Sequence, residues 1–329
     1  MEQVITRYTS IKLRIYPTPE QAATIDATID GCRYLWNQML SDEREFFAAT
    51  DKHYIPAPAK YKRSAPFLAE ADSQALNAVH QNLQKTFKEF FADPCYSRYP
   101  SFKRKKSQQS SYRTCCHHRP GKPDSVRIEG DGIMLPRLRW VKAKMHRRPM
   151  HWWTLQHATV SRTPTGKYFC SLTYQYAVRP PKPVQPDPAK LLGLQYSMEH
   201  FFITDKSEAA DPPKWAAKNA EKINRLQKQL GRMVRGSANY EKQRLKLARV
   251  YERIANQRRD YIHKLSRRIA NASDGVCVRS EDLRGLKGAE GGYGMFRLCL
   301  EYKLKRLGKP LVYIDGDVRE ADLEELFAG

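Results

Sequence analysis

Apolar residues recur at helical spacing between residues 244 and 273, at Leu247, Val250, Ile254, Tyr261, Leu265 and Ile269. This pattern predicts a long helix that packs one side against a core. Asp274 and Gly275 predict the end of the helix, and the apolar residues 276–278 predict a short buried strand. That strand leads to Glu281. Because open α/β sheets present reactive groups at strand ends, Glu281 is a candidate site residue.

Near the beginning of the chain, apolar and polar residues alternate one by one instead of recurring at helical spacing. Residues 10–16 place apolar and basic side chains in turn, which predicts a half-buried strand. Thr18 followed by Pro19 predicts the start of a helix, and Asp72 with Ser73 predicts the start of another. The intervening segment 56–66 is rich in proline and lysine and is predicted to be a loop.

Two β-hairpins are predicted in the middle of the chain. Residues 126–128 and 133–135 flank a Gly-Asp-Gly turn, and residues 159–163 and 168–176 flank a second turn. Together with the first strand, these hairpins predict a small β-barrel. The helices between the first strand and the hairpins would then be an insertion into that barrel.

A proline-rich segment, residues 179–188, predicts a stiff linker and a domain boundary. Beyond it the patterns predict a hairpin over 191–204 and helices from about 214 to 273. A strand, a helix over 295–307 and a strand over 310–314 follow. This order is typical of an RNase H-like α/β fold. The fold class expected for the whole chain is therefore α+β and multidomain.

The charge balance indicates a polyanionic partner. Lys and Arg number 58 against 35 for Asp and Glu, a net charge of +23 spread through both halves. Nucleic acid is the partner that this excess favours. No apolar run approaches the roughly 18 residues of a membrane span, and the first ten residues do not resemble a signal peptide. We therefore expect a protein of the bacterial cytoplasm, associated with the nucleoid.

The seven cysteines show no C-x-x-C spacing, which is typical of reduced thiols. The run Cys115, Cys116, His117 and His118 has the residue types of metal ligands. However, adjacent residues do not easily surround one ion, so no metal is expected there.

Basic residues that could contact a nucleic-acid backbone fall into two groups, a loop after Phe102 and one face of the long helix. They are Lys103, Arg104, Lys105, Lys106, Arg113, Arg249, Arg253, Arg259, His263 and Arg267. Phe102 and Tyr112 bracket the loop, and aromatic side chains beside cations favour contacts to bases and phosphates. The alternative for the loop is a solvated basic surface.

Several blocks of residues resemble TnpB proteins, which are transposon-encoded, RNA-guided DNA nucleases related to type V CRISPR effectors. In the second half these blocks are residues 256–266, 281–283 and 300–303. In the first half they are residues 13–17, 32–37, 83–91, 99–106 and 111–114. The blocks occur in the order of the family and cover nearly the whole chain up to about residue 314.

The resemblance implies a domain organisation. Residues 1–16 and 119–178 would form a wedge β-barrel, and residues 17–118 would form an inserted helical recognition domain. The linker 179–188 would lead to a RuvC-like domain over residues 189–329.

It also implies partners: a structured, non-coding guide RNA and a double-stranded target DNA with a short adjacent motif. Four residues occupy positions at which the family recognises the short DNA motif, and we call them the motif readers. They are Tyr54, Ser73, Asn77 and His117. The alternatives are a helix cap for Ser73 and a loop anchor for Tyr54.

The chain departs from the family at its metal site. Gln195 stands where the resemblance implies a metal-binding Asp, and Glu281 matches the second acid. Asp322 belongs either to an unrelated acidic end, which we favour, or to a remnant of the third acidic motif. The family's zinc ribbon has no counterpart, and the RuvC-like domain is expected to be truncated at its C-terminus. RuvC-type cleavage uses two divalent ions about 4 Å apart, and Mg²⁺ prefers charged oxygen ligands. A carboxamide supplies no charge, so we expect neither a Mg²⁺ site nor another cofactor. The alternative for Glu281 is an ion pair with Arg279 or Arg284.

These observations predict a nuclease-dead, TnpB-like protein of the kind that represses transcription by RNA-guided occupancy of DNA. Three alternatives stay open. One is residual nuclease activity through Glu281 and Asp322. The second is guide-independent RNA binding, and the third is a transposon remnant without function. The sequence does not indicate any protein partner.

Overall fold

The computed structural model describes residues 4–94, 97–105, 110–118, 120–197, 199–280, 292–319 and 321–327. The chain divides into two compact units, Val4–Val178 and Arg179–Gly329. The boundary coincides with the start of the proline-rich segment. Each unit has its own core, so each is described by itself.

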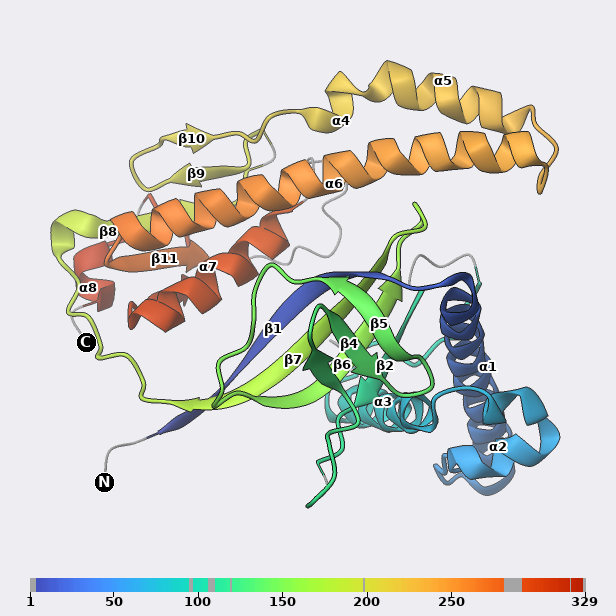
Figure 1. The fold of residues 1–329 in the computed structure, drawn as a ribbon. Helices are drawn as coiled ribbons and strands as arrows, with labels where there is room; N and C mark the ends of the chain where they lie inside the picture. The colour runs from blue at the N-terminus through green and yellow to red at the C-terminus, as the bar shows by residue number, and fades with distance from the viewer. Residues whose placement is uncertain are drawn as a thin grey trace. The chain divides into compact units, whose positions relative to one another are not determined.

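A seven-stranded antiparallel sheet forms the centre of the first unit (Figure 1). Its strands are β1 (Ile5–Tyr16), β2 (Ser110–Cys115), β3 (Arg127–Glu129), β4 (Gly132–Leu135), β5 (Arg139–Lys144), β6 (Thr154–Arg162) and β7 (Tyr168–Val178), in the order β2-β6-β7-β1-β5-β4-β3. Strand β1 pairs with β7 over nearly its whole length and with β5 at its end. Ile11, Leu13 and Ile15 are buried, which confirms the predicted alternation.

The helices of this unit are α1 (Pro19–Thr50), α2 (Pro58–Ser64), the 3₁₀ helix η1 (Pro66–Ala69) and α3 (Ser73–Ala92). Thr18 and Gln21 form a reciprocal capping box at the start of α1, and Asp72 accepts the Gln74 N–H at the start of α3. Both predicted helix starts are confirmed. The predicted loop over 56–66 is wrong, because Pro58 is tolerated in the first turn of a helix and α2 begins there.

The predicted barrel is also wrong, because among the described residues the sheet stays open, with β2 and β3 at its two edges. The apolar side of the sheet is covered by helices instead of by closure. Side chains of α1 and α3, such as Leu35 and Leu83, belong to the same buried cluster as Leu13 and Leu172 of the strands. Two strands of the sheet, β2 and β5, were not predicted.

The second unit contains a five-stranded mixed sheet. Its strands are β8 (Leu191–Gln195), β9 (Phe202–Thr204), β10 (Ala209–Ala210), β11 (Gly275–Arg279) and β12 (Leu311–Ile314), in the order β10-β9-β8-β11-β12. Strands β8, β11 and β12 are parallel, whereas β9 is antiparallel to β8. The predicted sequence of hairpin, helices, strand, helix and strand is confirmed.

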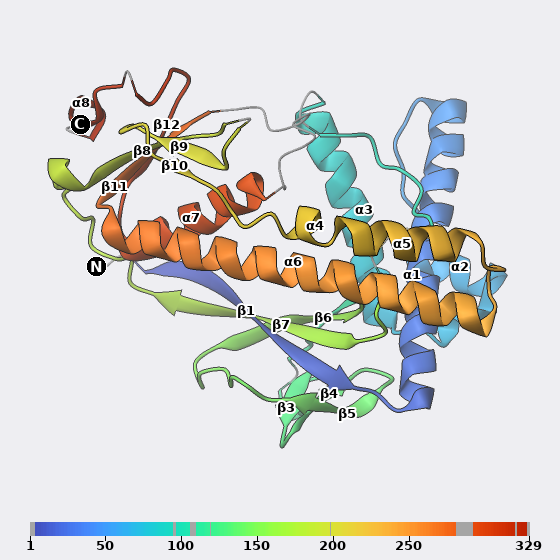
Figure 2. The same cartoon turned by 90° about the horizontal axis from the view of Figure 1, so that it is seen from above.

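The helices of the second unit are the short η2 (Pro188–Lys190), α4 (Trp215–Lys218), α5 (Ala220–Gly231), α6 (Ala238–Ala272), α7 (Tyr293–Leu307) and α8 (Leu323–Phe327). Figure 2 shows α5 and α7 lying along the long helix α6. Val250, Ile254, Leu265 and Ile269 are buried, which confirms the apolar stripe predicted for α6. Leu265 and Ile269 join α7 and the sheet in one core, whereas Val250 and Ile254 pack on α5.

Candidate nucleic-acid interface

The segment that carries the lysine-rich motif is fastened to α1. Trp36 donates its indole N–H to the Ser101 carbonyl at 3.0 Å. The Asn37 side chain makes two bonds with the backbone of Lys103, donating to its carbonyl at 2.9 Å and accepting its N–H at 2.7 Å. Two motif blocks that are more than 60 residues apart therefore hold each other in place. Neither Trp36 nor Asn37 was predicted as a site residue, although both belong to block 32–37, which resembles the TnpB family.

The basic side chains that follow differ in their surroundings. The Lys103 ammonium lies 3.7 Å from the centroid of the Trp36 ring, and partial desolvation lowers the pKa of this lysine. Arg104 is exposed, and Lys105 forms an exposed ion pair with Asp30 at 3.3 Å. Lys106 lies outside the described residues. The structure thus places Lys103, Arg104 and Lys105 at the surface of the first unit, where backbone contacts are possible.

The two aromatic residues predicted to bracket the basic loop differ in exposure. Phe102 is half exposed, and the Arg44 guanidinium lies 4.8 Å from its ring centroid. Tyr112 is only 5% exposed because it points into the core from β2. Tyr112 is therefore not an exposed ring beside the loop, while the next residue on the strand, Arg113, is exposed on the opposite face.

The predicted motif readers lie on several elements. Asn77 is exposed on α3, one turn beyond Ser73, so the two share a helix face. The Ser73 hydroxyl accepts from the Lys62 ammonium at 3.3 Å, and Asp72 is the N-cap, so the alternative role of Ser73 as the cap is wrong. Tyr54 is more than half exposed and lies beside the Phe46 ring.

His117 is exposed and follows the end of β2, where its backbone N–H is donated to the Ser125 hydroxyl. The structure brings Ser73 and Asn77 together, but it shows no contact of His117 with the other three readers among the described residues.

Three possible metal ligands converge beside β6. The ligand atoms of Cys116, His118 and Asp124 lie within 4.8 Å of one another. Both ring nitrogens of His118 are already used: Nδ1 faces an Asp124 oxygen at 2.8 Å, and Nε2 faces the Leu155 carbonyl at 2.8 Å. Both partners are acceptors, so this ring bonds best as an imidazolium. The arrangement fits a charged hydrogen-bonded link better than a four-ligand zinc centre.

This link predicts a pH-dependent stability. The hydrogen bond to Asp124, and then that to Leu155, raise the pKa of His118 above 6.5. The ion pair therefore contributes fully below about pH 6.5, and its contribution is lost as the pH rises through the folded-state pKa. Because both side chains are more than a third exposed, we expect less than about 1 kcal/mol.

Urea unfolding of the wild type and of His118→Gln at about pH 5.5 and about pH 8.5 measures this effect. The difference between the two proteins should shrink at the higher pH. Burial and Arg113 lower the pKa of the neighbouring His157 to about 4, but this effect is the same in both proteins and cancels in the difference between them. A difference that is equal at both pH values would contradict the charged link.

The predicted basic face of α6 is exposed. Arg249, Arg253, Arg259, His263 and Arg267 all reach the surface. His263 and Arg267 also line a groove of about 500 Å³ together with Lys264, Arg268, Tyr302 and Lys303. Lys303 links α7 to α6 by donating to the His263 carbonyl and the Ser266 hydroxyl. Tyr302 and Lys303 belong to block 300–303, which resembles the TnpB family, but neither was predicted as a site residue.

The position of the implied metal-binding Asp is occupied by a carboxamide with internal partners. Gln195 ends β8 and is 7% exposed. Its Oε1 accepts the backbone N–H of Val318 at 3.3 Å, and its side chain also bonds to Asp317. Val318 is fully buried, and a Cβ on Gly193 would lie 3.1 Å from its Cβ. The segment after β12 therefore packs directly on this face of β8.

The nearby acids are also engaged. Arg319 bonds to both carboxylate oxygens of Asp317 and lowers the pKa of that group well below its usual value. Asp322 accepts the N–H groups of Glu324 and Glu325, and so caps α8. Glu281 lies outside the described residues. Among the described residues, the oxygen atoms available as metal ligands belong to the Gln195 carboxamide and to two carboxylates that are already hydrogen-bonded. This set does not fit a pair of Mg²⁺ ions.

Among the described residues, no helix combines the length and apolar character needed to cross a bilayer.

Comparisons with known proteins agree with this fold. Residues 173–289 match the OrfB_IS605 family model, described as a probable transposase. Residues 6–52 match a model described as a helix-turn-helix domain, although this region contains the strand β1 and the single helix α1. The cryo-EM structure of a Cas12f1–sgRNA–target DNA complex matches with a TM-score of 0.51 and 10% identity, covering 94% of this chain and 89% of the other. The chain thus has a Cas12f-like multidomain α/β fold.

Two curated relatives are more similar in sequence. A "putative RNA-guided DNA endonuclease" of Streptomyces pristinaespiralis is 27% identical over 93% of this chain and 77% of its own length. The "putative RNA-guided DNA endonuclease InsQ" of Escherichia coli K12 is 28% identical over 84% of this chain and 67% of its own length. Together with the motif blocks, these matches support the TnpB family for this chain.

Proposed function

We propose that this protein binds a structured guide RNA, uses it to select double-stranded DNA beside a short motif, and blocks transcription by staying bound without cutting. The names of the two relatives support RNA-guided action on DNA. The net charge of +23 and the exposed basic faces of both units suit phosphate contacts, which supply most of the affinity for nucleic acids.

The main support for the proposal that the protein does not cut DNA is the environment of Gln195. Its carboxamide stands where the family resemblance implies a metal-binding carboxylate, and it is bonded to Val318 and Asp317. A RuvC-type site needs charged oxygen ligands that hold two cations close together. Here the neutral side chain and the packed segment around Val318 replace that arrangement.

A second candidate function is an RNA-guided endonuclease. It is favoured by the names of both relatives, which are described as endonucleases. This function would require Glu281 and Asp322 to hold the metal ions without a carboxylate at position 195. Asp322 would then have to leave the N–H groups that it caps.

Sequencing the RNA that co-purifies with the protein tests the guide. We expect one defined, structured RNA that stays bound through washing at about 0.5 M salt, because contacts to a specific RNA shape are weakened less by salt than phosphate contacts are. An Arg253→Glu/Arg267→Glu variant should retain less of the same RNA. Heterogeneous, degraded RNA that washes off at modest salt would instead favour guide-independent RNA binding.

A further inference from the structure

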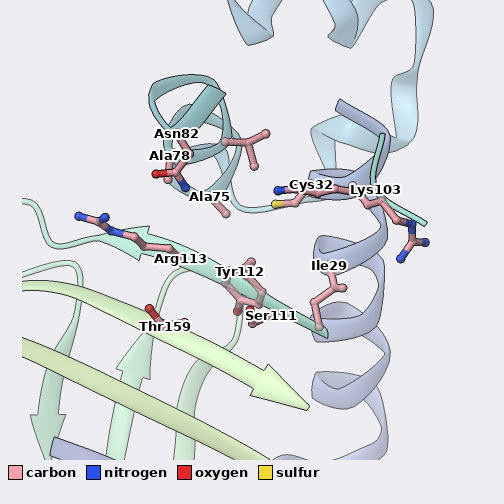
Figure 3. Close-up of a pocket in the computed structure, with 12 residues that line it drawn as sticks. Ile29, Cys32, Ala75, Ala78, Asn82, Lys103, Ser111, Tyr112, Arg113 and Thr159 are labelled. Carbon is pink, nitrogen blue, oxygen red and sulfur yellow. The ribbon is translucent and has the colours of Figure 1, made fainter. Parts of the chain in front are cut away.

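A small hollow in the first unit has no assigned role. It has a volume of about 210 Å³ and lies between α1, α3 and the edge strand β2 (Figure 3). Small-molecule sites commonly measure about 300–1,000 Å³. The hollow is therefore too small for a large ligand, but it offers room for one planar ring system.

Apolar side chains of two helices line part of the hollow. Ala75, Ala78 and Val79 of α3 form one wall, and Ile29 and Cys32 of α1 form another. The two alanines have the smallest apolar side chains, so the surface of α3 is open at this point. Apolar side chains on both helices can contact the faces of an unstacked base.

The rim of the hollow is polar and basic. Figure 3 shows Asn82, Arg113 and Thr159 on one side and Lys103 on the other. Arg113 and Thr159 are cross-strand partners in β2 and β6, so both side chains leave the sheet on the same face.

Among the residues that the structure describes, the Asn82 amide, the Arg113 guanidinium and the Thr159 hydroxyl have no hydrogen-bond or ion-pair partner. The Lys103 ammonium is partly desolvated, and its backbone is held by Asn37. An amide can read a base edge, a hydroxyl can bond to a sugar hydroxyl, and the cations can meet a phosphate. These are the groups that one nucleotide requires.

We propose that this hollow binds one unpaired ribonucleotide of the bound RNA, with its base between α1 and α3 and its phosphate beside Arg113 or Lys103. The inference rests on the proposed function for the identity of the RNA. The proposed contact goes beyond phosphate binding, because a single unpaired base would lie against the side of α3 that carries Ala75, Ala78 and Asn82. Asn77 lies on a different face of the helix.

The test uses RNA-free protein labelled at alanine and isoleucine methyl groups and titrated with AMP, GMP, CMP and UMP. The methyl signals of Ala75, Ala78 and Ile29 should shift with at least one ribonucleotide. Asn82→Ala/Arg113→Ala should weaken that binding about fivefold or more, the effect of losing one base contact. The control Gln84→Ala/Lys88→Ala removes an amide and a positive charge from exposed positions of α3 outside the hollow, and it should bind like the wild type.

Unmoved methyl signals with all four ribonucleotides would overturn the proposal, as would equal losses in the two double variants. Equal binding of the matching deoxyribonucleotide would overturn the assignment to RNA and favour displaced DNA. Because the titration contains no guide RNA, its result is separable from the failure of the proposed function. That function is judged by the co-purified RNA.

Discussion

Incubated with its guide RNA, Mg²⁺ and a matched duplex, the protein is expected to form a stable complex and to leave both DNA strands intact. The reason is that the side chains near the end of β8 supply too few charged oxygen ligands for metal ions. Gln195 provides a neutral oxygen that already accepts the Val318 N–H, and Asp317 is held by Arg319. Two dications placed there would repel each other with too little negative charge between them. Denaturing gels of both labelled strands measure nicking, and a mobility shift on the same sample measures binding.

The substitution Gln195→Asp should not restore cleavage. The shorter aspartate would lie near Asp317, where two carboxylates repel and the pKa of one of them rises. The segment around Val318 would still pack on Gly193. If Gln195→Asp does cut, then Asp322 and Glu281 complete a working site. If the unmodified protein cuts and Glu281→Ala abolishes the activity, the proposal that the nuclease is inactive is wrong.

The substitution Asn77→Ala should weaken binding to a duplex that carries the correct adjacent motif by about 1–3 kcal/mol, or roughly 5- to 150-fold. Asn77 is exposed on α3, and an amide can make two hydrogen bonds to one base edge. Guide-RNA affinity should not change, because the RNA does not depend on the motif. Filter binding of labelled DNA and of labelled RNA gives the two affinities.

The control for this prediction is Gln84→Ala, which removes an exposed amide from the same helix about two turns away. It should leave both affinities unchanged. Equal losses of DNA and RNA binding by Asn77→Ala would show that Asn77 supports the fold. An unchanged DNA affinity would remove Asn77 from the motif readers.

Local patterns predicted most of the elements correctly. The helix start at Thr18, the apolar stripe on α6 and the two β-hairpins depend on residues close in sequence, so their signals are readable without the fold. Strand β2 was missed because it follows a basic segment that resembles a loop. Its burial at Tyr112 and Thr114 depends on the distant β6 and on α1 and α3. The open sheet was missed for a similar reason, since helices far away in sequence cover its apolar side.

The sequence by itself determined the strong positive charge, the family resemblance and the presence of Gln195 at the expected position of an acid. These are properties of residue identity and order. Only the tertiary structure decided which groups meet. Asn37 bonds to Lys103 across 66 positions, and Gln195 bonds to Val318 across 123. The hollow likewise joins α1, α3, β2 and β6. Such contacts are set by the packing of whole elements, because no local periodicity records which distant backbone group will satisfy a buried side chain.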